Sequence, residues 1–308
     1  MLRYFIRRVL LAVPVLLGVA TLVFSLIHLV PGDPAQAMMG DGASPQDVAE
    51  LRKSLGLDQP LLTQYGTFLR NAIKGDLGKS FRTGQPVTMM IVERIPATAE
   101  LAVAAMIIAV LIAIPLGVIA AVWRGTAIDY SAMTFALAGV SIPNFWLGPL
   151  LAIVFAVELG WLPVSGRGTL AHLVLPAISL GLALAAILAR MTRASLLDEL
   201  GELYVRAARA RGVSNTAAIS RHALRNSMVP LLTIIALQFG AVLTGAVITE
   251  TIFAWPGIGR FMFEAIKNRD YPVIQGTTLI FSLLFMLTSV LVDLLYGVLD
   301  PRVRKRMK

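Results

Sequence analysis

The sequence predicts an all-α polytopic membrane protein with six transmembrane helices. Of its 308 residues, 57% are hydrophobic and only 15% are charged, and the mean hydropathy is +0.77. Soluble domains carry roughly 25% charged residues, so the apolar excess must face lipid. A helix needs about 20 apolar residues to cross the hydrocarbon of a bilayer. Six segments reach or approach this length, over residues 9–30, 101–123, 131–157, 172–189, 226–249 and 276–299.

The distribution of basic residues predicts that both termini are cytoplasmic. With the N-terminus inside, the inside segments hold 16 of the 27 Lys and Arg residues but only six of the 18 Asp and Glu residues. Basic residues close to membrane spans are retained on the cytoplasmic side. This rule also accounts for the net charge of +9 without nucleic acid as a partner.

The spans divide the chain into four parts. Residues 1–30 form an N-terminal tail with the first span, 31–96 an outer segment, 97–300 the core with spans two to six, and 301–308 a basic tail. A cleaved signal peptide is the alternative for residues 1–30, but their apolar run of 22 residues exceeds the roughly 7–15 of a signal core. Retention therefore gives six spans.

Two amphipathic helices are predicted in the outer segment. Ser44 before Pro45 is a helix start, and Gly56 is a stop. Apolar residues recur at helical spacing between Leu61 and Ile73, and Gly75 follows them. The outer segment is expected either to cap the bundle or to form a platform for an external partner.

Small residues and prolines predict how the spans pack. Gly181, Ala185 and Ala189 recur every four residues, a spacing that lets helix backbones approach closely. Prolines within or near the spans predict kinks or breaks; they are Pro115, Pro143, Pro149 and Pro176. Helices of this kind suit a bundle that opens and closes.

The sequence lacks the patterns of an enzyme or a metal site. It has no cysteine, and its three histidines form no HExxH pair. Gly78-Lys79-Ser80 lacks the upstream glycine of a phosphate-binding loop, because position 73 is isoleucine. Few ionisable residues lie inside the spans, which disfavours a carrier driven by buried ions. The chain is therefore not expected to be an enzyme.

The stretch from Tyr204 to Pro230 carries the strongest functional signal. Seven arginines lie between Arg190 and Arg225, and membrane-length apolar segments flank this loop. An alanine pair followed after three residues by Gly212 predicts two short helices hinged at a glycine, because glycine tolerates positive φ. The pattern indicates a docking element for a cytoplasmic partner.

This loop resembles that of ABC importer permeases. The family pattern is E-A-A-x-x-x-G-x(9)-I-x-L-P. This chain has the similar arrangement Arg206-Ala207-Ala208, three residues, Gly212, nine residues and then His222-Ala223-Leu224. Arg206 replaces the glutamate, His222 the isoleucine and Arg225 the proline. Seven further stretches resemble the dipeptide/oligopeptide/nickel branch of that family. They are LVPGDP at 29–34, LGLDQPL at 55–61, GDLGKS at 75–80, ELGWLP at 158–163, TRASLLDEL at 192–200, WPGIGR at 255–260 and RDYPVIQ at 269–275.

The resemblance implies a machine with several partners. It implies the type I ABC importer permease fold in the bacterial inner membrane, paired with a second, homologous permease. Two cytoplasmic ATPases, which bind ATP and Mg, and a periplasmic substrate-binding protein complete it. The chain itself is expected to hold no cofactor and no metal.

The resemblance also places the site residues. It implies that the loop over residues 190–225 docks in an ATPase groove. The implied coupling residues are Arg206, Ala207, Ala208, Arg209, Ala210, Arg211, Gly212, Arg221, His222 and Leu224. Polar residues near the third and fifth spans are the candidates for the translocation pathway, namely Ser141, Asn144 and Gln238.

The expected function is ATP-driven uptake of short peptides, either dipeptides and oligopeptides or glutathione, by alternating access. Two alternatives stay open. A nickel-chelate permease belongs to the same branch and is not separated from a peptide permease by these residues. A self-contained secondary transporter belongs to a different class and predicts uptake without ATPase subunits.

Overall fold

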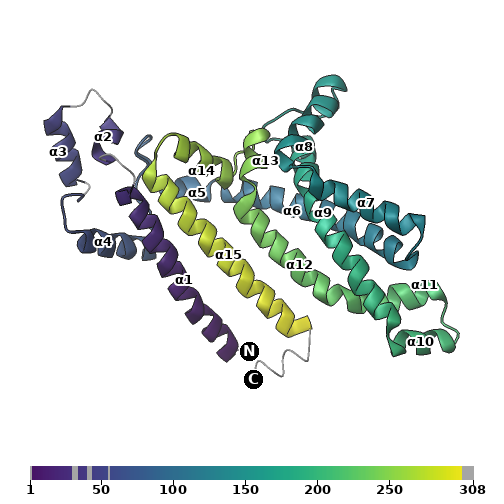
Figure 1. Cartoon of the computed structure of the whole chain (residues 1–308). Helices are drawn as coiled ribbons and strands as arrows, with labels where there is room; N and C mark the ends of the chain where they lie inside the picture. The colour runs from purple at the N-terminus through teal and green to yellow at the C-terminus, as the bar shows by residue number, and fades with distance from the viewer. Residues whose placement is uncertain (1, 30–33, 40–43, 55, 300–308) are drawn as a thin grey trace.

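The computed structural model describes residues 2–29, 34–39, 44–54 and 56–299 (Figure 1). Within these residues every regular element is a helix, apart from one isolated bridge between Lys79 and Pro86. Long helices lie side by side across Figure 1, in the order α1 (Leu2–Leu29), α15 (Tyr271–Leu299), α12 (Leu224–Gly245) and α9 (Leu170–Gly201). The all-α prediction is confirmed.

Five of the described helical segments are long and apolar enough to cross a membrane. Their bounds are Leu10–Leu29, Val87–Val122, Leu170–Gly201, Asn215–Leu243 and Tyr271–Val292. They match the first, second, fourth, fifth and sixth of the predicted spans. The large hydrophobic side chains left exposed on them suit a lipid environment.

The third predicted span is not one continuous helix. α7 (Ala127–Ser141) ends at Ile142, whose φ of −86° and ψ of 116° are extended, and α8 (Asn144–Leu151) begins after Pro143. Proline disfavours the helical conformation of the residue before it, which explains the break. The π-helix η1 (Ala152–Glu158) continues α8 after Pro149. The break was predicted from the prolines, whereas the π-helix was not.

The centre of the bundle is the long contact between α6 (Ile95–Val122) and α9. Alanines of α6 are completely buried there, including Ala105 and Ala109. A Cβ on Gly181 of α9 would lie 2.8 Å from the carbonyl oxygen of Ala105, so only glycine permits this approach. The close contact predicted from Gly181 and its alanine neighbours is thus confirmed as packing within the chain.

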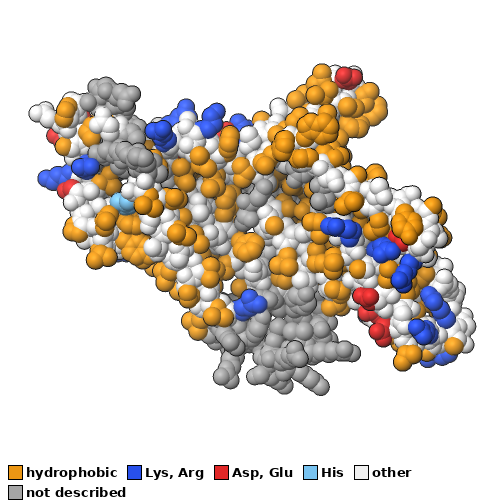
Figure 2. Space-filling model, in the orientation of Figure 1, with side chains coloured by type: hydrophobic (Ala, Val, Ile, Leu, Met, Phe, Trp, Pro, Cys, Tyr) orange, Lys and Arg blue, Asp and Glu red, His pale blue; other side chains and the backbone are white. Residues whose placement is uncertain are grey.

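The bundle has two distinct ends. α10 (Leu203–Ala210) and α11 (Asn215–Ala217) lie at one end, where α1 begins and α15 finishes (Figure 1). We call this the α10 end. α13 (Val247–Ile252) and α14 (Ile258–Lys267) lie at the opposite end, which we call the α14 end. Basic side chains gather over the α10 end, others lie over the α14 end, and hydrophobic side chains cover the middle of the visible face (Figure 2).

The outer segment folds into short helices that attach to the bundle. α4 begins and ends as predicted, and Gly56 and Gly75 adopt the positive φ of helix stops, 68° and 79°. Buried Ser80 donates to Oδ2 of buried Asp270 at 2.5 Å, which fixes the loop after α4 to the start of α15. The helices of this segment are α2 (Pro34–Met39), α3 (Pro45–Ser54), α4 (Leu61–Ile73) and α5 (Val87–Val92).

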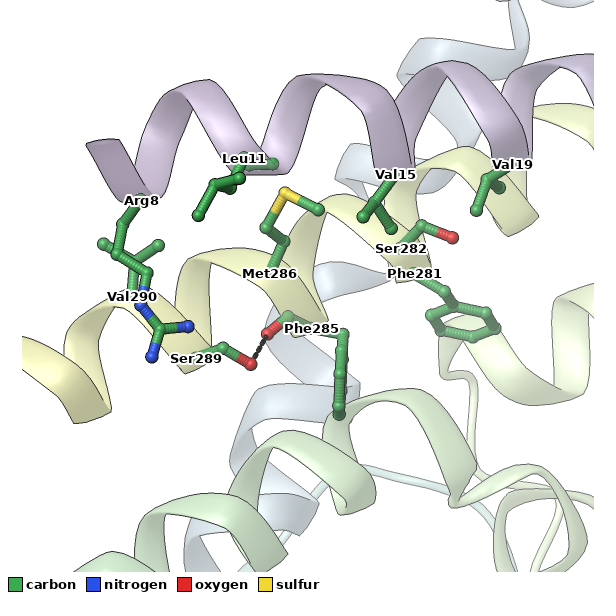
Figure 3. Close-up of a pocket in the computed structure, with 11 residues that line it drawn as sticks. Arg8, Leu11, Val15, Val19, Phe281, Ser282, Phe285, Met286, Ser289 and Val290 are labelled. Carbon is green, nitrogen blue, oxygen red and sulfur yellow. Dashed lines mark hydrogen bonds between the residues drawn. The ribbon is translucent and has the colours of Figure 1, made fainter. Parts of the chain in front are cut away.

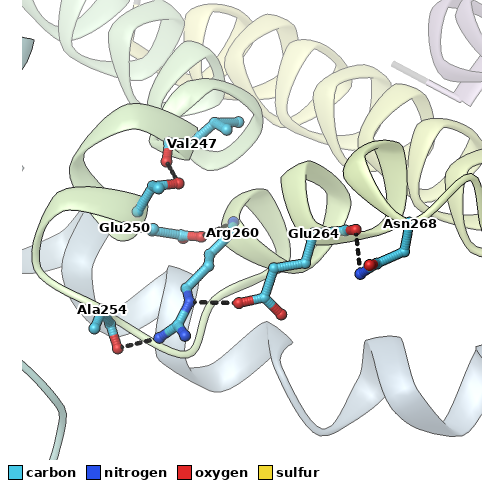
Figure 4. Close-up of polar contacts among 7 residues, drawn as sticks. Val247, Glu250, Ala254, Arg260, Glu264 and Asn268 are labelled. Carbon is cyan, nitrogen blue, oxygen red and sulfur yellow. Dashed lines mark hydrogen bonds and ion pairs between the residues drawn. The ribbon is translucent and has the colours of Figure 1, made fainter.

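A buried carboxylate organises the α14 end (Figure 4). Glu250 is inaccessible to solvent, and it accepts hydrogen bonds from Thr98 Oγ1 at 2.7 Å and from the backbone N–H of Arg260 at 2.9 Å. Burial raises the pKa of this carboxyl, and these hydrogen bonds partly offset the rise. The indole of Trp255 donates to the carbonyl of Ala97 at 2.8 Å, so α6, α13 and α14 form one rigid unit.

Candidate coupling site

The predicted hinge lies where the chain leaves α10. Gly212 has a φ of 87°, which a residue with a Cβ adopts only with strain. After it, Ser214 Oγ accepts from the backbone N–H of Ala217 at 3.3 Å and caps α11. The prediction of two helices hinged at glycine is confirmed. The second is not short, because α11 continues through the π-helix η2 (Ala218–Ala223) into α12.

α10 has one face packed on the bundle and one face in solvent. Val205 is buried in a cluster that includes Leu196 of α9 and Ala218 of η2. Ala208 is also buried, with 1% of its surface exposed. Their spacing of three residues places them on the same side of the helix. The exposed face comprises Arg206, Ala207, Arg209 and Ala210, and Arg211 caps its C-terminal end.

The other predicted coupling residues follow the hinge. Arg221 is exposed, whereas His222 and Leu224 are partly buried. Four arginines, at positions 206, 209, 211 and 221, form no ion pair with a described residue. Their charge therefore remains available to an acidic surface outside the chain. The structure thus brings exposed arginines together and places Ala208 inside.

A tyrosine braces α10 against its neighbours. The Tyr204 hydroxyl donates to the carboxylate of Glu199 on α9 and accepts from Asn226 Nδ2 on α12 at 2.9 Å. Burial is the main cause that raises the pKa of Tyr204, and the hydrogen bond to Glu199 raises it further. These bonds join three helices around one side chain. No local sequence pattern indicates this brace, because its members are distributed over 28 positions.

An ion pair connects α7 to α9. Arg193 Nε and Nη2 each lie 2.7 Å from an oxygen of Asp129, whose side chain is only 3% exposed. The hydrogen bond from Arg193 is the main cause that lowers the pKa of Asp129. Gly125 adds a backbone hydrogen bond at 3.0 Å. The pair fixes the start of α7 to the half of α9 that leads to α10.

The three candidate pathway residues lie in two places. Ser141 ends α7, and its hydroxyl donates to Leu137 within the same helix at 3.0 Å. Asn144 begins α8 after the break, and its side chain lies outside the described residues. Gln238 lies within α12, and neither atom of its buried amide has a partner among the described residues. An unpaired buried amide is energetically costly.

The described helices define a polytopic membrane protein with an exposed basic helix at one end. Two solved structures share the fold. An amino acid ABC transporter with histidines has a TM-score of 0.54, covering 68% of this chain and 94% of that chain. The inward-facing MetNI methionine ABC transporter has a TM-score of 0.55, covering 69% of this chain and 97% of that chain. Each is 16% identical in sequence to this chain.

The chain belongs to the family described as the binding-protein-dependent transport system inner membrane component. It matches that family over residues 113–305 and the N-terminal component of such systems over residues 1–102. It is therefore a multi-pass permease of the inner membrane.

Two curated relatives match almost the full chain. It is 44% identical to the dipeptide transport system permease protein DppB of Alkalihalophilus pseudofirmus, over 99% of this chain and 100% of the relative. It is 46% identical to the glutathione transport system permease protein GsiC of Escherichia coli (strain K12), over 99% of each chain.

Proposed function

We propose that this chain is the permease subunit of an ABC importer that takes up short peptides, either dipeptides and oligopeptides or glutathione. The observation that carries the proposal is the identity of 44–46% to a dipeptide permease and glutathione permeases over 99% of this chain. Identity of that extent over both the spans and the loops supports a shared translocation task. The two relatives differ in their named substrate, so the proposed substrate is the class that both share, short peptides.

The proposed importer contains a second, homologous permease, two ATPases and a periplasmic binding protein. ATP and Mg bind to the ATPases, and this chain contributes half of the pathway without a catalytic group. No group of three or more His, Cys, Asp or Glu side chains that could hold a metal ion occurs in the described part of the chain. The binding protein delivers peptide at the α14 end, beside the outer segment.

We assign the α10 end to the cytoplasm and the α14 end to the periplasm. The exposed arginines of α10 support this orientation, because basic loops stay in the cytoplasm. The helix pair α7 and α8 with η1 supplies the sixth crossing as a broken span. Both termini are then cytoplasmic, the segment 31–96 is periplasmic, 97–300 is the transmembrane core and 301–308 is a basic cytoplasmic tail.

The exposed face of α10 is the proposed coupling surface. Ala207 and Ala210 allow close approach of a partner backbone, and the arginines beside them reach carboxylates or carbonyls of an ATPase. Ala208 acts from the other side, because it anchors α10 to the bundle. A force on α10 passes through Val205, which packs with Leu196 of α9, and from α9 to α6 along the extensive contact between these two described helices.

Alternating access follows from this arrangement. ATP binding draws the two ATPases together, and with them the coupling helices of the paired permeases. The inner gate closes and the periplasmic mouth opens to the loaded binding protein, whereas ATP hydrolysis reverses the change. Gln238, Ser141 and Asn144 are the proposed polar contacts of the peptide along this path.

The coupling surface is tested by two substitutions and a matched control. Ala207→Asp puts an acid on the exposed face, and Gly212→Val strains the hinge at a φ of 87°. We expect each to reduce the ATPase recovered with the tagged permease by about tenfold or more, a loss of at least about 1.4 kcal/mol. Arg82→Glu, in the exposed outer loop, is the control and retains the ATPase. Normal recovery in both α10 variants would refute the assignment.

Substrate class is tested by competition in proteoliposomes that contain the whole importer and its binding protein. Uptake of a labelled dipeptide is measured against unlabelled dipeptides, longer peptides, glutathione and a nickel chelate. We expect competition by peptides or by glutathione. Competition by the nickel chelate alone supports the nickel permease instead. Uptake that continues without the ATPases supports a secondary transporter.

A further inference from the structure

Two hollows lie along α1, on either side of a contact with α15. At this contact Gln275 Nε2 donates to the carbonyl of Val23 at 3.1 Å, and Val23 is buried. Toward the α10 end lies a groove lined mostly by apolar side chains, such as Leu11, Val15 and Phe281 (Figure 3). Toward the α14 end, where α3 and α4 lie beside the end of α1 (Figure 1), the second hollow is polar as well as apolar. We call it the outer cavity.

The outer cavity has the size of a small-molecule site. Its volume is about 780 Å³, and such sites measure about 300–1,000 Å³. Residues from the end of α1, from α3, from α4, from the loop after α4 and from the start of α15 line it. Polar groups that converge from several elements can recognise a ligand by more than its apolar surface.

Hydrogen bonds hold the walls of the outer cavity in place. Gln64 of α4 donates to the carbonyl of Gln59 at 2.8 Å, and its Oε1 lies 3.1 Å from His28 Nε2 of α1. Another wall is the loop after α4, which the bond between Ser80 and Asp270 fixes to α15. A ligand therefore meets walls that are already ordered, which lowers the entropic cost of binding.

Three polar groups in the lining have no partner among the described residues. They are the ammonium groups of Lys53 on α3 and Lys79 in the loop after α4, and the side-chain amide of Asn71 on α4. The carboxylate of Asp76 lines the cavity too, and its Oδ1 accepts from the backbone N–H of Gly78 at 3.0 Å. Two ammonium groups against one carboxylate attract a negatively charged group, and the carboxylate favours a ligand that also carries a positive one.

From this lining we infer that the outer cavity binds a short peptide, with the terminal carboxylate of the peptide at Lys53 and Lys79. Asp76 receives the terminal ammonium group, and the amide of Asn71 both donates to and accepts from a peptide bond. An inorganic anion would leave Asn71 and Asp76 unused, whereas a zwitterionic peptide engages every one of these groups.

The inference rests on the proposed function for the peptide class, and it adds a site away from the proposed pathway. Ser141 and Gln238, the candidate pathway residues whose side chains are described, do not line the outer cavity. Its apolar lining, which includes Leu57, Phe68 and Phe81, accepts the side chains of the peptide. A peptide held there stays beside the α14 end.

The test uses the assembled importer with its ATPases, in nanodiscs and without the binding protein. The probe is alanyl-photoleucine, a dipeptide whose diazirine cross-links to its contacts under light, and mass spectrometry maps the labelled positions. We expect label within residues 56–84, and about threefold less of it after Lys53→Gln or Lys79→Gln, the effect of one exposed ion pair. Lys74→Gln, on an exposed lysine that does not line the cavity, is the control and keeps the label. The C-terminal amide of the probe lacks the carboxylate and should label the cavity about tenfold less.

A second pair of variants tests the cavity by filling it. Asn71→Trp puts a large side chain into the lining and is expected to abolish the label within residues 56–84. Leu62→Trp, about 180° away around α4 on a side chain that is 85% exposed, is the control and keeps the label.

Equal labelling by the dipeptide and its amide would overturn the inference, as would label that neither the lysine variants nor Asn71→Trp reduces. So would efficient cross-linking of Asn71→Cys to the binding protein, because protein would then fill the cavity. Uptake of labelled dipeptide by the same importer separates the two proposals. Uptake without label in the cavity overturns this inference alone, whereas absence of uptake refutes the proposed function and the peptide class of this site with it.

Discussion

Glycines around Glu250 show how a single position determines packing at the residue scale. A Cβ on Gly257 would overlap the Glu250 carboxylate, and a Cβ on Gly259 would lie 2.8 Å from Val247 Cα. The carboxylate has no room to move, because Thr98 and the backbone of Arg260 hold it from two sides. The WPGIGR sequence therefore has a physical explanation: its glycines admit a buried acid.

Gly257→Ala is expected to destabilise the protein by about 3 kcal/mol, since overpacking a filled core costs about 1–3 kcal/mol and here also disturbs a buried carboxylate. The measurement is the apparent melting temperature in detergent. Gly66→Ala is the control, because nothing lies within 4 Å of its Cβ position in α4, and a gain of about 0.5–1 kcal/mol is expected there. Equal melting temperatures for the two variants would contradict this packing.

The ion pair of Asp129 and Arg193 makes a second prediction at this scale. Arg193→Ala leaves a carboxylate that is 3% exposed without its partner, so we expect a loss of about 3 kcal/mol. The double variant with Asp129→Ala should lose less than the sum of the two single losses, by about 1–3 kcal/mol. Additive losses in a double-mutant cycle would show that the pair does not couple α7 to α9.

The ion pair of Asp129 and Arg193 also makes the stability of the protein depend on pH. Because the folded protein lowers the pKa of Asp129, its contribution to stability is fully present above the unfolded pKa of about 4. It is lost as the pH falls through the lower folded pKa. Between pH 5 and 8, therefore, the difference in stability between the wild type and Asp129→Asn should stay constant, and it should shrink below pH 4.

At the element scale, the hydrogen bonds of Tyr204 hold α10 in position. Tyr204→Phe removes the hydrogen bonds to Glu199 and Asn226 but keeps the ring. We expect faster backbone hydrogen exchange over Leu203–Ala210 and weaker coupling of ATP hydrolysis to uptake, with membrane insertion unchanged. Tyr130→Phe, on an exposed tyrosine of α7, is the control. Unchanged exchange in α10 after Tyr204→Phe would mean that its apolar anchor alone positions it.

Individual elements differ in how far the sequence predicted them. α4 has the predicted bounds, because its apolar period and Gly75 are local signals. The hinge at Gly212 was predicted for the same reason. The π-helices η1 and η2 were not, since no local pattern distinguishes them from α-helix. The bond between Ser80 and Asp270, 190 positions apart, depends on tertiary contact and is invisible to sequence periodicity.

The coupling residues were predicted as a set, and the structure shows that they differ in burial. Arg206 and Ala207 are exposed, whereas Ala208 is 1% exposed. The motif marks the loop but not which side of α10 meets the bundle, because that depends on the burial of Val205 against other helices. Substituting Ala207 and Ala208 together would therefore combine a docking defect with a folding defect. A substitution of Ala207 alone tests docking without that complication.

At the scale of the whole molecule, one rigid path connects the two ends. α10 is anchored to α9, α9 packs along α6, and α6 is bonded to α13 and α14 through Trp255 and Glu250. The break at Pro143 lies beside this path, in helices that pack on α9. We therefore expect a displacement of α10 to reach the α14 end by this path, and we expect the joint between α7 and α8 to let these two helices move separately.

In the proposed importer, α10 couples a partner ATPase to peptide uptake. The most direct measurement is labelled-dipeptide uptake by proteoliposomes that contain the importer, with ATP inside, for the wild type, Ala207→Asp and Arg82→Glu. We predict ATP-dependent uptake for the wild type and for Arg82→Glu, and for Ala207→Asp a loss of about tenfold or more with the permease still inserted. Uptake that persists in Ala207→Asp, or in liposomes without the ATPases, would contradict the account.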